Sequence, residues 1–245
     1  MARPVITPAL VLGLVVLVPA LASAQLGELS RSAEAQATPS TPVVERLGTN
    51  LFQVGSIRVD TAAREISVAG RINPDVVALE FIANTRGGVK AYETAMTLDT
   101  DAITFNTALL LIGLDRTRAR NAPTAHYDPA TPDGDSVDVS IDCPGRECQR
   151  MPAERLMYDT NAKQTVPPGK WVYTGSAFLP DGRYLAHIDG TLVGFVHDPS
   201  TIIEYAAGAG LNRWGSIVLN PNLGLKPGTA LTLTVKAIPR PAGGR

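Results

Sequence analysis

The chain has 245 residues, with 22 Lys and Arg, 23 Asp and Glu, and a formal net charge of −1 at pH 7. A chain so close to neutral lacks the clustered positive charge that nucleic acid or an anionic membrane surface requires, so nucleic acid is not an expected partner. The length is sufficient for one domain with a hydrophobic core of its own.

Residues 1–24 have the features of a secretory signal peptide: a basic start at Arg3, an apolar run and an Ala-Ser-Ala end. The sequence therefore predicts cleavage after Ala24. An uncleaved membrane anchor is the alternative, but two prolines and a glycine interrupt the run, and no later segment is apolar for long enough to span a bilayer. No Cys follows the cleavage site to carry a lipid, so we expect a secreted or periplasmic protein without stable membrane insertion.

The composition divides the mature chain into three parts. Residues 25–49 mix Ser, Ala, Thr and Pro without periodicity and are predicted to be a disordered linker, and residues 239–245 a disordered tail. Residues 50–238 are predicted to form one domain, with a polar surface insertion at 116–135.

Alternating apolar residues predict most of the domain to be strands. Residues 56–72 form a predicted hairpin in which Ile57 and Val59 face Ile66 and Val68. Residues 77–85 and 89–98 form a second predicted hairpin around the Arg-Gly-Gly segment 86–88.

Two helices interrupt this pattern. Asp99 or Asp101 is placed to cap a helix over about 101–113, which ends at Gly113 and is apolar enough to be buried. A short helix over about 199–206 is expected because Asp198 is suited to the cap position and Pro199 to the first helical position.

Further strands are predicted at 136–143, 171–178, 183–197 and 230–238. Asp189-Gly190 is a two-residue turn signal and predicts that 183–197 folds as a hairpin. The expected fold class is therefore α+β, with a mostly antiparallel sheet, one buried helix and one short helix.

The two cysteines, Cys143 and Cys148, flank a Pro-Gly turn at the end of a predicted strand. Such a position brings two Cα atoms to a bridgeable distance, so we expect a disulfide in an oxidising compartment. A redox-active dithiol is the weaker alternative, because the spacing is not Cys-x-x-Cys. Two thiolates are too few for an iron–sulfur cluster, and no cofactor is expected.

Several segments in order resemble the YdjY-domain family of bacterial exported proteins. They are GGVKAYET, ALLLIGL, PAERLMYD, WVYTGS, a strand ending in HDP, and NPNLGLKPGTALTLTV, and together they cover roughly residues 50–238. The family has no established activity, so the resemblance implies none. Some relatives are described as ferredoxin-like, from which this chain departs by lacking the cysteines.

The segment GGVKAYET also differs from the family pattern K-x-H-E-[ST], because Tyr92 occupies the place of a His. A site that depends on imidazole chemistry at this position is therefore in doubt, since a phenol with a pKa near ~10 is a poor base at neutral pH.

Strand alternation over 89–98 predicts that Lys90 and Tyr92 share one face and that Glu93 lies on the other. Lys90 and Tyr92 are then ordinary strand residues unless they form part of a site. A sheet-edge carboxylate, or a pair with Arg71 or Arg86, is the structural interpretation of Glu93. Its small apolar neighbours favour a raised pKa instead, which makes Glu93 the leading candidate acid or base.

The histidines and arginines give weaker signals. His187 and His197 are predicted to diverge on the hairpin and His126 lies in a loop, so no metal site is expected from them. His197 remains a candidate site residue because it stands at a strand–helix junction. The arginines at 116, 118 and 120 can bind an anion, but a solvated charge run is the commoner arrangement.

Trp171, Tyr173 and Ser176 are candidates for an aromatic ligand platform, with core packing as the commoner alternative. No G-x-S-x-G, H-E-x-x-H or phosphate-binding glycine loop is present in a suitable context. We therefore expect an exported cell-envelope protein that acts as a binding or accessory module for a small ligand or an envelope protein. The alternative is an enzyme of unknown class in which Glu93 is the general acid or base, assisted by Lys90, Tyr92 and His197.

Overall fold

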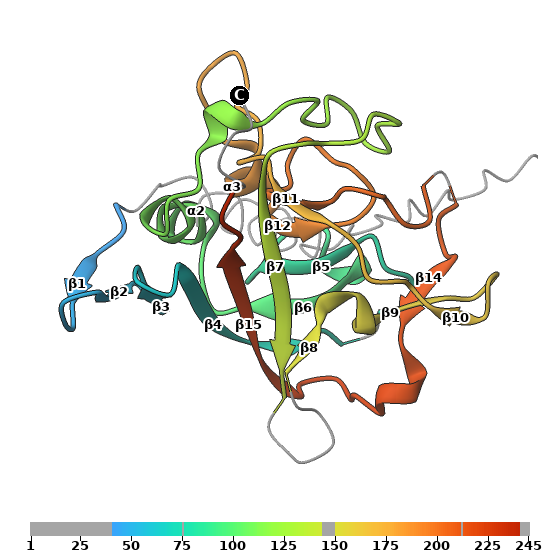
Figure 1. Cartoon of the computed structure of the whole chain (residues 1–245). Helices are drawn as coiled ribbons and strands as arrows, with labels where there is room; N and C mark the ends of the chain where they lie inside the picture. The colour runs from blue at the N-terminus through green and yellow to red at the C-terminus, as the bar shows by residue number, and fades with distance from the viewer. Residues whose placement is uncertain (1–40, 75, 144–149, 212, 241–245) are drawn as a thin grey trace, which may run out of the picture. The chain divides into compact units, whose positions relative to one another are not determined.

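The computed structural model describes residues 41–74, 76–143, 150–211 and 213–240 (Figure 1). The predicted signal peptide and its cleavage site after Ala24 lie outside these residues. Cys148 does so as well, and the Cys143–Cys148 disulfide therefore stays a prediction.

Eight strands form a sheet that closes on itself (Figure 1). In order around the ring they are β4 (Glu65–Ile72), β15 (Ala230–Ala237), β7 (Asp135–Asp142), β11 (Trp171–Tyr173), β13 (Ile203–Tyr205), β12 (Thr191–Gly194), β5 (Phe81–Thr85) and β6 (Thr94–Leu98). The ring closes because β4 pairs with β15 along one edge and with β6 at the end of the other edge. All pairs in it are antiparallel except β12–β13 and β5–β6.

The remaining elements extend or cover this closed sheet. They are β1 (Val44–Arg46), β2 (Leu51–Val54) and β3 (Ile57–Asp60), which continue from β4; β8 (Met151–Pro152), which pairs with β7; and a separate sheet of β10 (Gln164–Thr165), β9 (Met157–Asp159) and β14 (Ile217–Leu219). The helices are α2 (Ala102–Leu111) and α3 (Leu185–Asp189), and the 3₁₀ turns are η1 (Ala91–Glu93), η2 (Arg116–Arg118), η3 (Ala153–Leu156) and η4 (Pro221–Leu223). No helix of the described ranges combines the length and the apolar composition needed to cross a membrane.

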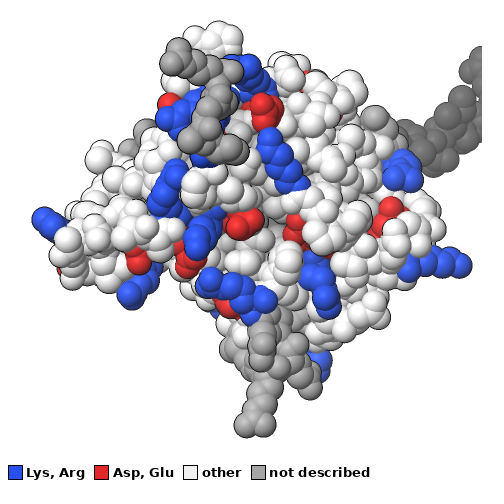
Figure 2. Space-filling model, in the orientation of Figure 1, with Lys and Arg blue, Asp and Glu red and all other residues white. Residues whose placement is uncertain are grey.

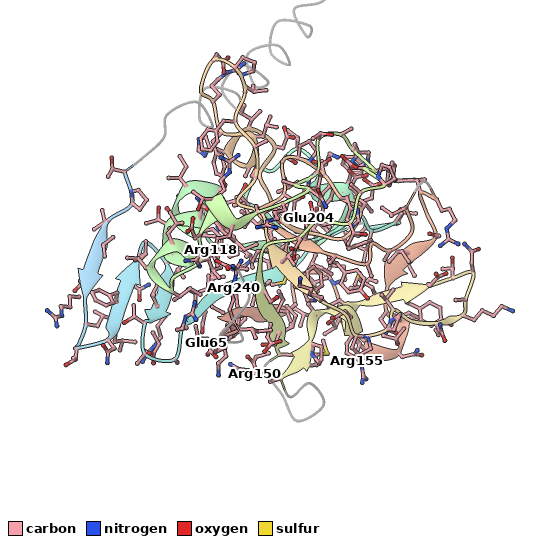
Figure 3. All side chains as sticks on the ribbon, turned by 45° about the horizontal axis from the view of Figure 1, so that its top comes forward. Glu65, Arg118, Arg150, Arg155, Glu204 and Arg240 are labelled. Carbon is pink, nitrogen blue, oxygen red and sulfur yellow. The ribbon has the colours of Figure 1, made fainter. Side chains whose placement is uncertain are left out.

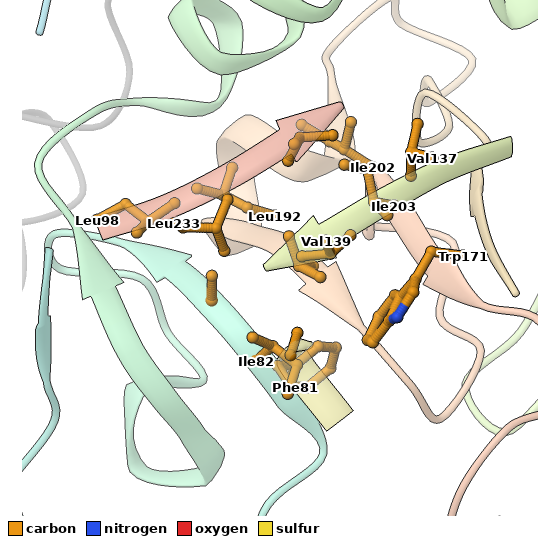
Figure 4. Packing of buried hydrophobic residues seen from close by; sticks show 14 of the residues in the cluster. Phe81, Ile82, Leu98, Val137, Val139, Trp171, Leu192, Ile202, Ile203 and Leu233 are labelled. Atoms are coloured by element: carbon orange, nitrogen blue, oxygen red, sulfur yellow. The ribbon is translucent and has the colours of Figure 1, made fainter. Parts of the chain in front are cut away.

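The interior of the closed sheet is apolar because alternate residues of each strand point inward. On β4 and β15 the pattern gives Ile66, Val68, Leu233 and Val235, all at most 1 % exposed. Figure 4 shows the side chains of Phe81, Leu192, Ile203, Leu233 and their neighbours meeting in this interior. Burial of this kind is the main stabilising contribution to the fold.

Gly70 permits the closure of the ring at β4. A Cβ atom at this position would lie 2.5 Å from the carbonyl oxygen of Thr97 on β6, which is closer than real Cβ atoms approach. The absence of a side chain therefore allows the two backbones to approach each other where the sheet closes.

The first hairpin and the buried helix are found as predicted. Val59 of β3 pairs with Ile66 of β4. In α2 the Asp101 side chain accepts hydrogen bonds from the backbone N–H groups of Ile103 and Thr104, so the helix begins at the predicted cap. Leu110 and Leu111, at its last turn, are 48 % and 40 % exposed, so burial stops before the end of the helix.

The second predicted hairpin is wrong. β5 and β6 are parallel neighbours, with Phe81 opposite Thr94 and Ala83 opposite Met96. The chain leaves β5, passes through the Arg-Gly-Gly segment and forms η1 before β6 begins at Thr94. Lys90, Tyr92 and Glu93 consequently lie in or beside a 3₁₀ turn and not on a strand.

The segment 184–206 also differs from the prediction. Leu185–Asp189 is a helix, and Gly190, with φ 74°, ends it in the left-handed conformation instead of turning a hairpin. The helix predicted over 199–206 is absent, because Ile203–Tyr205 forms β13. Asp198 still accepts from the backbone N–H of Ser200, but this side-chain bond closes a turn and not a helix.

The folded part begins earlier than predicted, since β1 lies within the range assigned to a linker and pairs with β2. At the other end Arg240, in the predicted tail, forms an ion pair with Asp135 at 3.0 Å.

Candidate functional site

Side chains from four segments of the chain meet in one charged group, which we call the Glu93 cluster. It consists of Glu80, Lys90, Glu93, His126, Tyr127 and Asp198. They come from the residue before β5, from η1, from the 116–135 insertion and from the loop after β12. The insertion is therefore not only a surface segment, because it places two of these side chains over the sheet.

Lys90 connects two of the acids. Its Nζ lies 3.8 Å from Glu93 Oε1 and 3.4 Å from Asp198 Oδ2, and it also lies 4.8 Å from the centre of the Phe81 ring. The predicted separation of Lys90 and Glu93 on opposite faces is wrong, because the turn η1 brings positions three apart together. Arg71 and Arg86, the predicted partners of Glu93, pair with Asp99 instead.

His126 bridges Asp198 and the third acid, Glu80. Its Nδ1 lies 2.7 Å from Asp198 Oδ2 and its Nε2 lies 3.2 Å from Glu80 Oε2. Tyr127 donates its hydroxyl proton to the second oxygen of Glu80. Both ring nitrogens of His126 thus face carboxylates, and only the protonated imidazolium can donate to both.

The pKa values of these groups follow from this arrangement. Hydrogen bonds to Asp198 and Glu80 raise the pKa of His126 to about 9. For Asp198 and Glu80 burial is the largest single influence and raises the pKa. Hydrogen bonds from His126 and from Ser200 or Tyr127, together with the charge of Lys90, outweigh it in sum and hold both pKa values below the usual range. At neutral pH these three groups are therefore ionised.

The pKa of Glu93 is shifted in the opposite direction to those of Asp198 and Glu80. Glu93 is 4 % exposed, and burial, followed by the nearby charge of Glu80, raises its pKa although Lys90 opposes the shift. The charges of Glu80 and Asp198 are already balanced by those of Lys90 and His126, so an ionised Glu93 adds an uncompensated negative charge. Of the three carboxyl groups in the cluster, Glu93 is consequently the one that holds a proton most readily.

Two aromatic residues border Glu93 at the surface. Tyr92 and Trp214 are 62 % and 63 % exposed, and both interact with the Glu93 carboxyl group: Trp214 lowers the pKa of Glu93, and Glu93 raises that of Tyr92. Burial, then the charge of Glu93, raises the pKa of Tyr92, so its phenol stays a donor at neutral pH. A buried carboxyl group thus lies beneath two exposed rings.

A second buried acid supports the cluster from within. Glu204 on β13 is fully buried and accepts a hydrogen bond from the backbone N–H of Asp198. Burial raises the pKa of Glu204 to about 8, so it is largely protonated at neutral pH. It fixes the backbone at Asp198 without adding a full charge beside that carboxylate.

His197 is buried, with φ 58°, next to the cluster in sequence but directed elsewhere. Its ring nitrogens lie 2.9 Å from the carbonyl oxygen of Asp128 and 3.1 Å from that of Tyr205. These contacts connect the insertion to β13. Among the described residues no ion pair or hydrogen bond joins the His197 ring to Lys90 or Glu93.

The candidate ligand platform is largely enclosed. Trp171, Tyr173 and Ser176 are 2 %, 0 % and 5 % exposed. Trp171 donates to Glu154, Tyr173 donates to Asn106, and Ser176 donates to backbone carbonyls of the loop at 199–200. None of the three presents a ring or hydroxyl to solvent at the Glu93 cluster.

The other predicted candidates are distributed over the structure. His187 lies in α3. Arg116 donates to the carbonyl oxygen of Ser176, and Arg118 pairs with Asp135 (labelled Arg118, Figure 3). Within the described ranges no three His, Cys, Asp or Glu side chains are arranged to hold a metal ion.

Sequence reasoning therefore missed Glu80, His126, Tyr127, Asp198 as a site residue, and Trp214. His126 and Tyr127 lie in a polar insertion, where no periodicity assigns a direction to a side chain. One signal was available: a His-Tyr pair between Pro-rich turns is an unusual place for two side chains that both need partners when buried.

A model of the YdjY domain matches residues 57–209. This match confirms the resemblance that the sequence motifs indicated. No curated protein and no solved structure matches the chain.

Proposed function

The chain belongs to the YdjY-domain family, and from this premise we propose that it is an exported cell-envelope binding module whose small-ligand site is the Glu93 cluster with Tyr92 and Trp214 at its surface. One observation carries the proposal: two exposed aromatic residues interact with the same buried carboxyl group.

Trp214 and Tyr92 place two large rings at the surface beside one buried acid. Aromatic side chains supply large contact areas with few rotatable bonds, and they are frequent where ligands bind. The Glu93 carboxyl group beneath them gives a bound molecule one directional hydrogen bond, while Lys90 and His126 keep the position of that group fixed. The expected ligand is a small molecule with an apolar face and a polar group beside it.

The test is a thermal-shift panel of soluble sugars, amino acids and nucleosides on the mature chain. A ligand that binds the folded state raises the melting temperature. We expect Tyr92→Ala and Trp214→Ala each to weaken the binding of an active compound about tenfold, which corresponds to about 1.4 kcal/mol.

Phe178→Ala is the matched control, because Phe178 is an aromatic residue that is 52 % exposed and contacts Arg116 and Tyr184 outside the cluster. The proposal is contradicted if all three variants lose the ligand-induced rise in melting temperature equally. It is also contradicted if no compound gives a rise that depends on Tyr92 or Trp214.

The raised pKa of Glu93 supports a second candidate, an enzyme of unknown class in which Glu93 is the general acid or base. In this role Glu93 is assisted by Lys90 and Tyr92, which interact with its carboxyl group. Turnover of a bound compound that Glu93→Gln abolishes, while the thermal shift persists, favours the enzyme. A shift without turnover favours the binding module.

A further inference from the structure

A groove of about 380 Å³ lies on the outer side of β7, in the part of the chain that the structure describes. Residues of β4, β7 and β15 form one wall, and Pro152, Glu154, Gly169 and Trp171 are among those that form the other. None of its lining residues belongs to the Glu93 cluster. Its volume is within the range of small-molecule sites.

The groove opens at a gap in the strand pairing of β7. β15 pairs with one edge of β7 from Val137 to Asp142. On the other edge β11 pairs up to Val137, and β8 pairs only at Ser140 and Ile141. No described strand covers Asp138 and Val139 on this edge, so the groove has an opening between β8 and β11.

Glu154 lies at this opening and is 4 % exposed. Its Oε1 accepts hydrogen bonds from Gly169 N and Trp171 Nε1, each at 3.0 Å. Its Oε2 is buried and has no hydrogen-bond partner in the described residues. No Lys, Arg or His of those residues forms an ion pair with it.

A buried carboxylate with an unused oxygen and only neutral donors is unfavourable, because both hydrogen bonding and charge compensation are incomplete. A partner that donates a hydrogen bond and carries positive charge completes both. A metal ion requires several convergent oxygen, nitrogen or sulfur ligands, and the described side chains provide no such group here. An ammonium group needs only acceptors.

We propose that this groove binds a small organic cation with a primary ammonium group, which donates to Glu154 Oε2. Met151, Pro152 and Pro168 line the groove with apolar surface for an alkyl chain, and the hydroxyl groups of Ser140 and Thr234 line it with further acceptors. The site is separate from the proposed function and does not depend on it.

The charges at the mouth of the groove permit entry of a cation. Arg150 pairs with Glu65 at 3.7 Å and with Asp142 at 3.1 Å, and Figure 3 shows Arg150 and Glu65 close to each other at this end of β7. Lys236 lies between Asp138 and Glu65 in the strand register. Figure 2 shows basic and acidic side chains interspersed over this face, so no large positive patch repels the ligand.

The chain contains two tryptophans, and Trp214→Phe leaves Trp171 as the single fluorescent indole. Because Trp171 donates to Glu154, its emission reports on a cation at that carboxylate. In the Trp214→Phe protein we expect n-butylammonium chloride to cause a saturable change in emission. Sodium chloride of equal ionic strength, n-butanol and tetramethylammonium chloride should not, since they lack the charge, the N–H donors or both.

Glu154→Gln in the same background keeps an acceptor for Gly169 and Trp171 but removes the negative charge. We expect n-butylammonium to bind at least about tenfold more weakly, as for the loss of one hydrogen bond to a charged group. Glu93→Gln should leave the Trp171 response unchanged, which separates this site from the Glu93 cluster.

Three results overturn the proposal: no saturable change with n-butylammonium, an equal change with tetramethylammonium, or a stronger saturable change with calcium chloride, which assigns the groove to a metal ion. The tetramethylammonium comparison is made in a protein with an intact Glu154, so it decides the question even where the Glu154→Gln variant fails to fold.

Discussion

Two buried groups of carboxylates in this protein obtain their hydrogen bonds in different ways. Asp198 and Glu80 in the Glu93 cluster face the cations Lys90 and His126. Glu154 faces only the neutral donors Gly169 N and Trp171 Nε1. Both environments bury the acid to the same degree, since Glu80, Asp198 and Glu154 are 3 %, 5 % and 4 % exposed.

This difference determines how much stability the protein loses when an acid of either group is removed. In the cluster the acids hold cations that come from distant segments, so loss of an acid leaves partly buried positive charge with one partner fewer. At Glu154 the loss leaves two neutral donors, each of which costs less to leave unpaired. The cluster therefore connects the insertion to the sheet, whereas Glu154 connects neighbouring loops and retains a free oxygen.

The largest expected effect is that of Asp198→Ala. The substitution leaves Lys90 Nζ and His126 Nδ1 without their shared acceptor. Because the two cations are 22 % and 36 % exposed and keep Glu93 and Glu80 as partners, the expected loss is below that of a fully buried pair, about 2–3 kcal/mol. Urea denaturation measures the change. Asp99→Ala is the control: Asp99 also has two basic partners, but its side chain is 28 % exposed, and a loss of about 0–1 kcal/mol is expected. Similar losses of unfolding free energy in both variants contradict the expectation that the cluster stabilises the protein more than the exposed pairs of Asp99.

A smaller effect is expected for Glu154→Ala. The backbone N–H of Gly169 and the indole N–H of Trp171 lose their acceptor, which costs about 1–3 kcal/mol. Glu154→Gln restores an acceptor in the same place and should cost less than the alanine variant in the same urea measurement. A loss for Glu154→Ala as large as that for Asp198→Ala contradicts the distinction between charged and neutral partners.

The sequence predicted those elements in which local pattern and tertiary packing agree. β15 and the β3–β4 hairpin alternate cleanly and lie with one face in the core, and Asp101 caps α2 where the sequence placed a cap. The hairpins predicted for the β5–β6 and α3–β12 regions were wrong for the same reason. Gly87 and Gly190 both have positive φ, which predicts a reversal of the chain but not which strand becomes the neighbour.

The candidate site was predictable in one respect only. Glu93 was selected because its small apolar neighbours indicated burial, and it is buried with a raised pKa. Its partners His126 and Asp198 are more than 30 and 100 residues away in sequence, in loops whose side-chain directions no periodicity fixes. Only the closure of the sheet and the path of the insertion bring them together.

The last prediction uses pH to test the cationic partner in the cluster. The pKa of His126 is about 9 in the folded protein and has an ordinary value of 6.5, so the folded state holds the proton more tightly. Its stabilising contribution is complete below about pH 6.5 and is lost as pH rises through about 9. The free energy of unfolding should therefore decrease over this window, and His126→Gln should decrease less. The measurement is urea denaturation from pH 6 to pH 10.

Glu204 gives a control with the same sign but a different window. Its pKa rises from 4.5 to about 8, so stability falls between these values because the unfolded chain releases the proton first. Both groups contribute between pH 6.5 and 8, so Glu204→Gln should make the loss of stability in this range smaller. It should leave the loss between pH 8 and 9, which belongs to His126. If His126→Gln instead shows the full alkaline loss, the imidazolium is not the group that compensates Asp198 and Glu80. Lys90 alone then balances the charges of Asp198 and Glu80. The contrast between the cluster, whose acids have cationic partners, and Glu154, which has only neutral donors, is then weaker than the distances indicate.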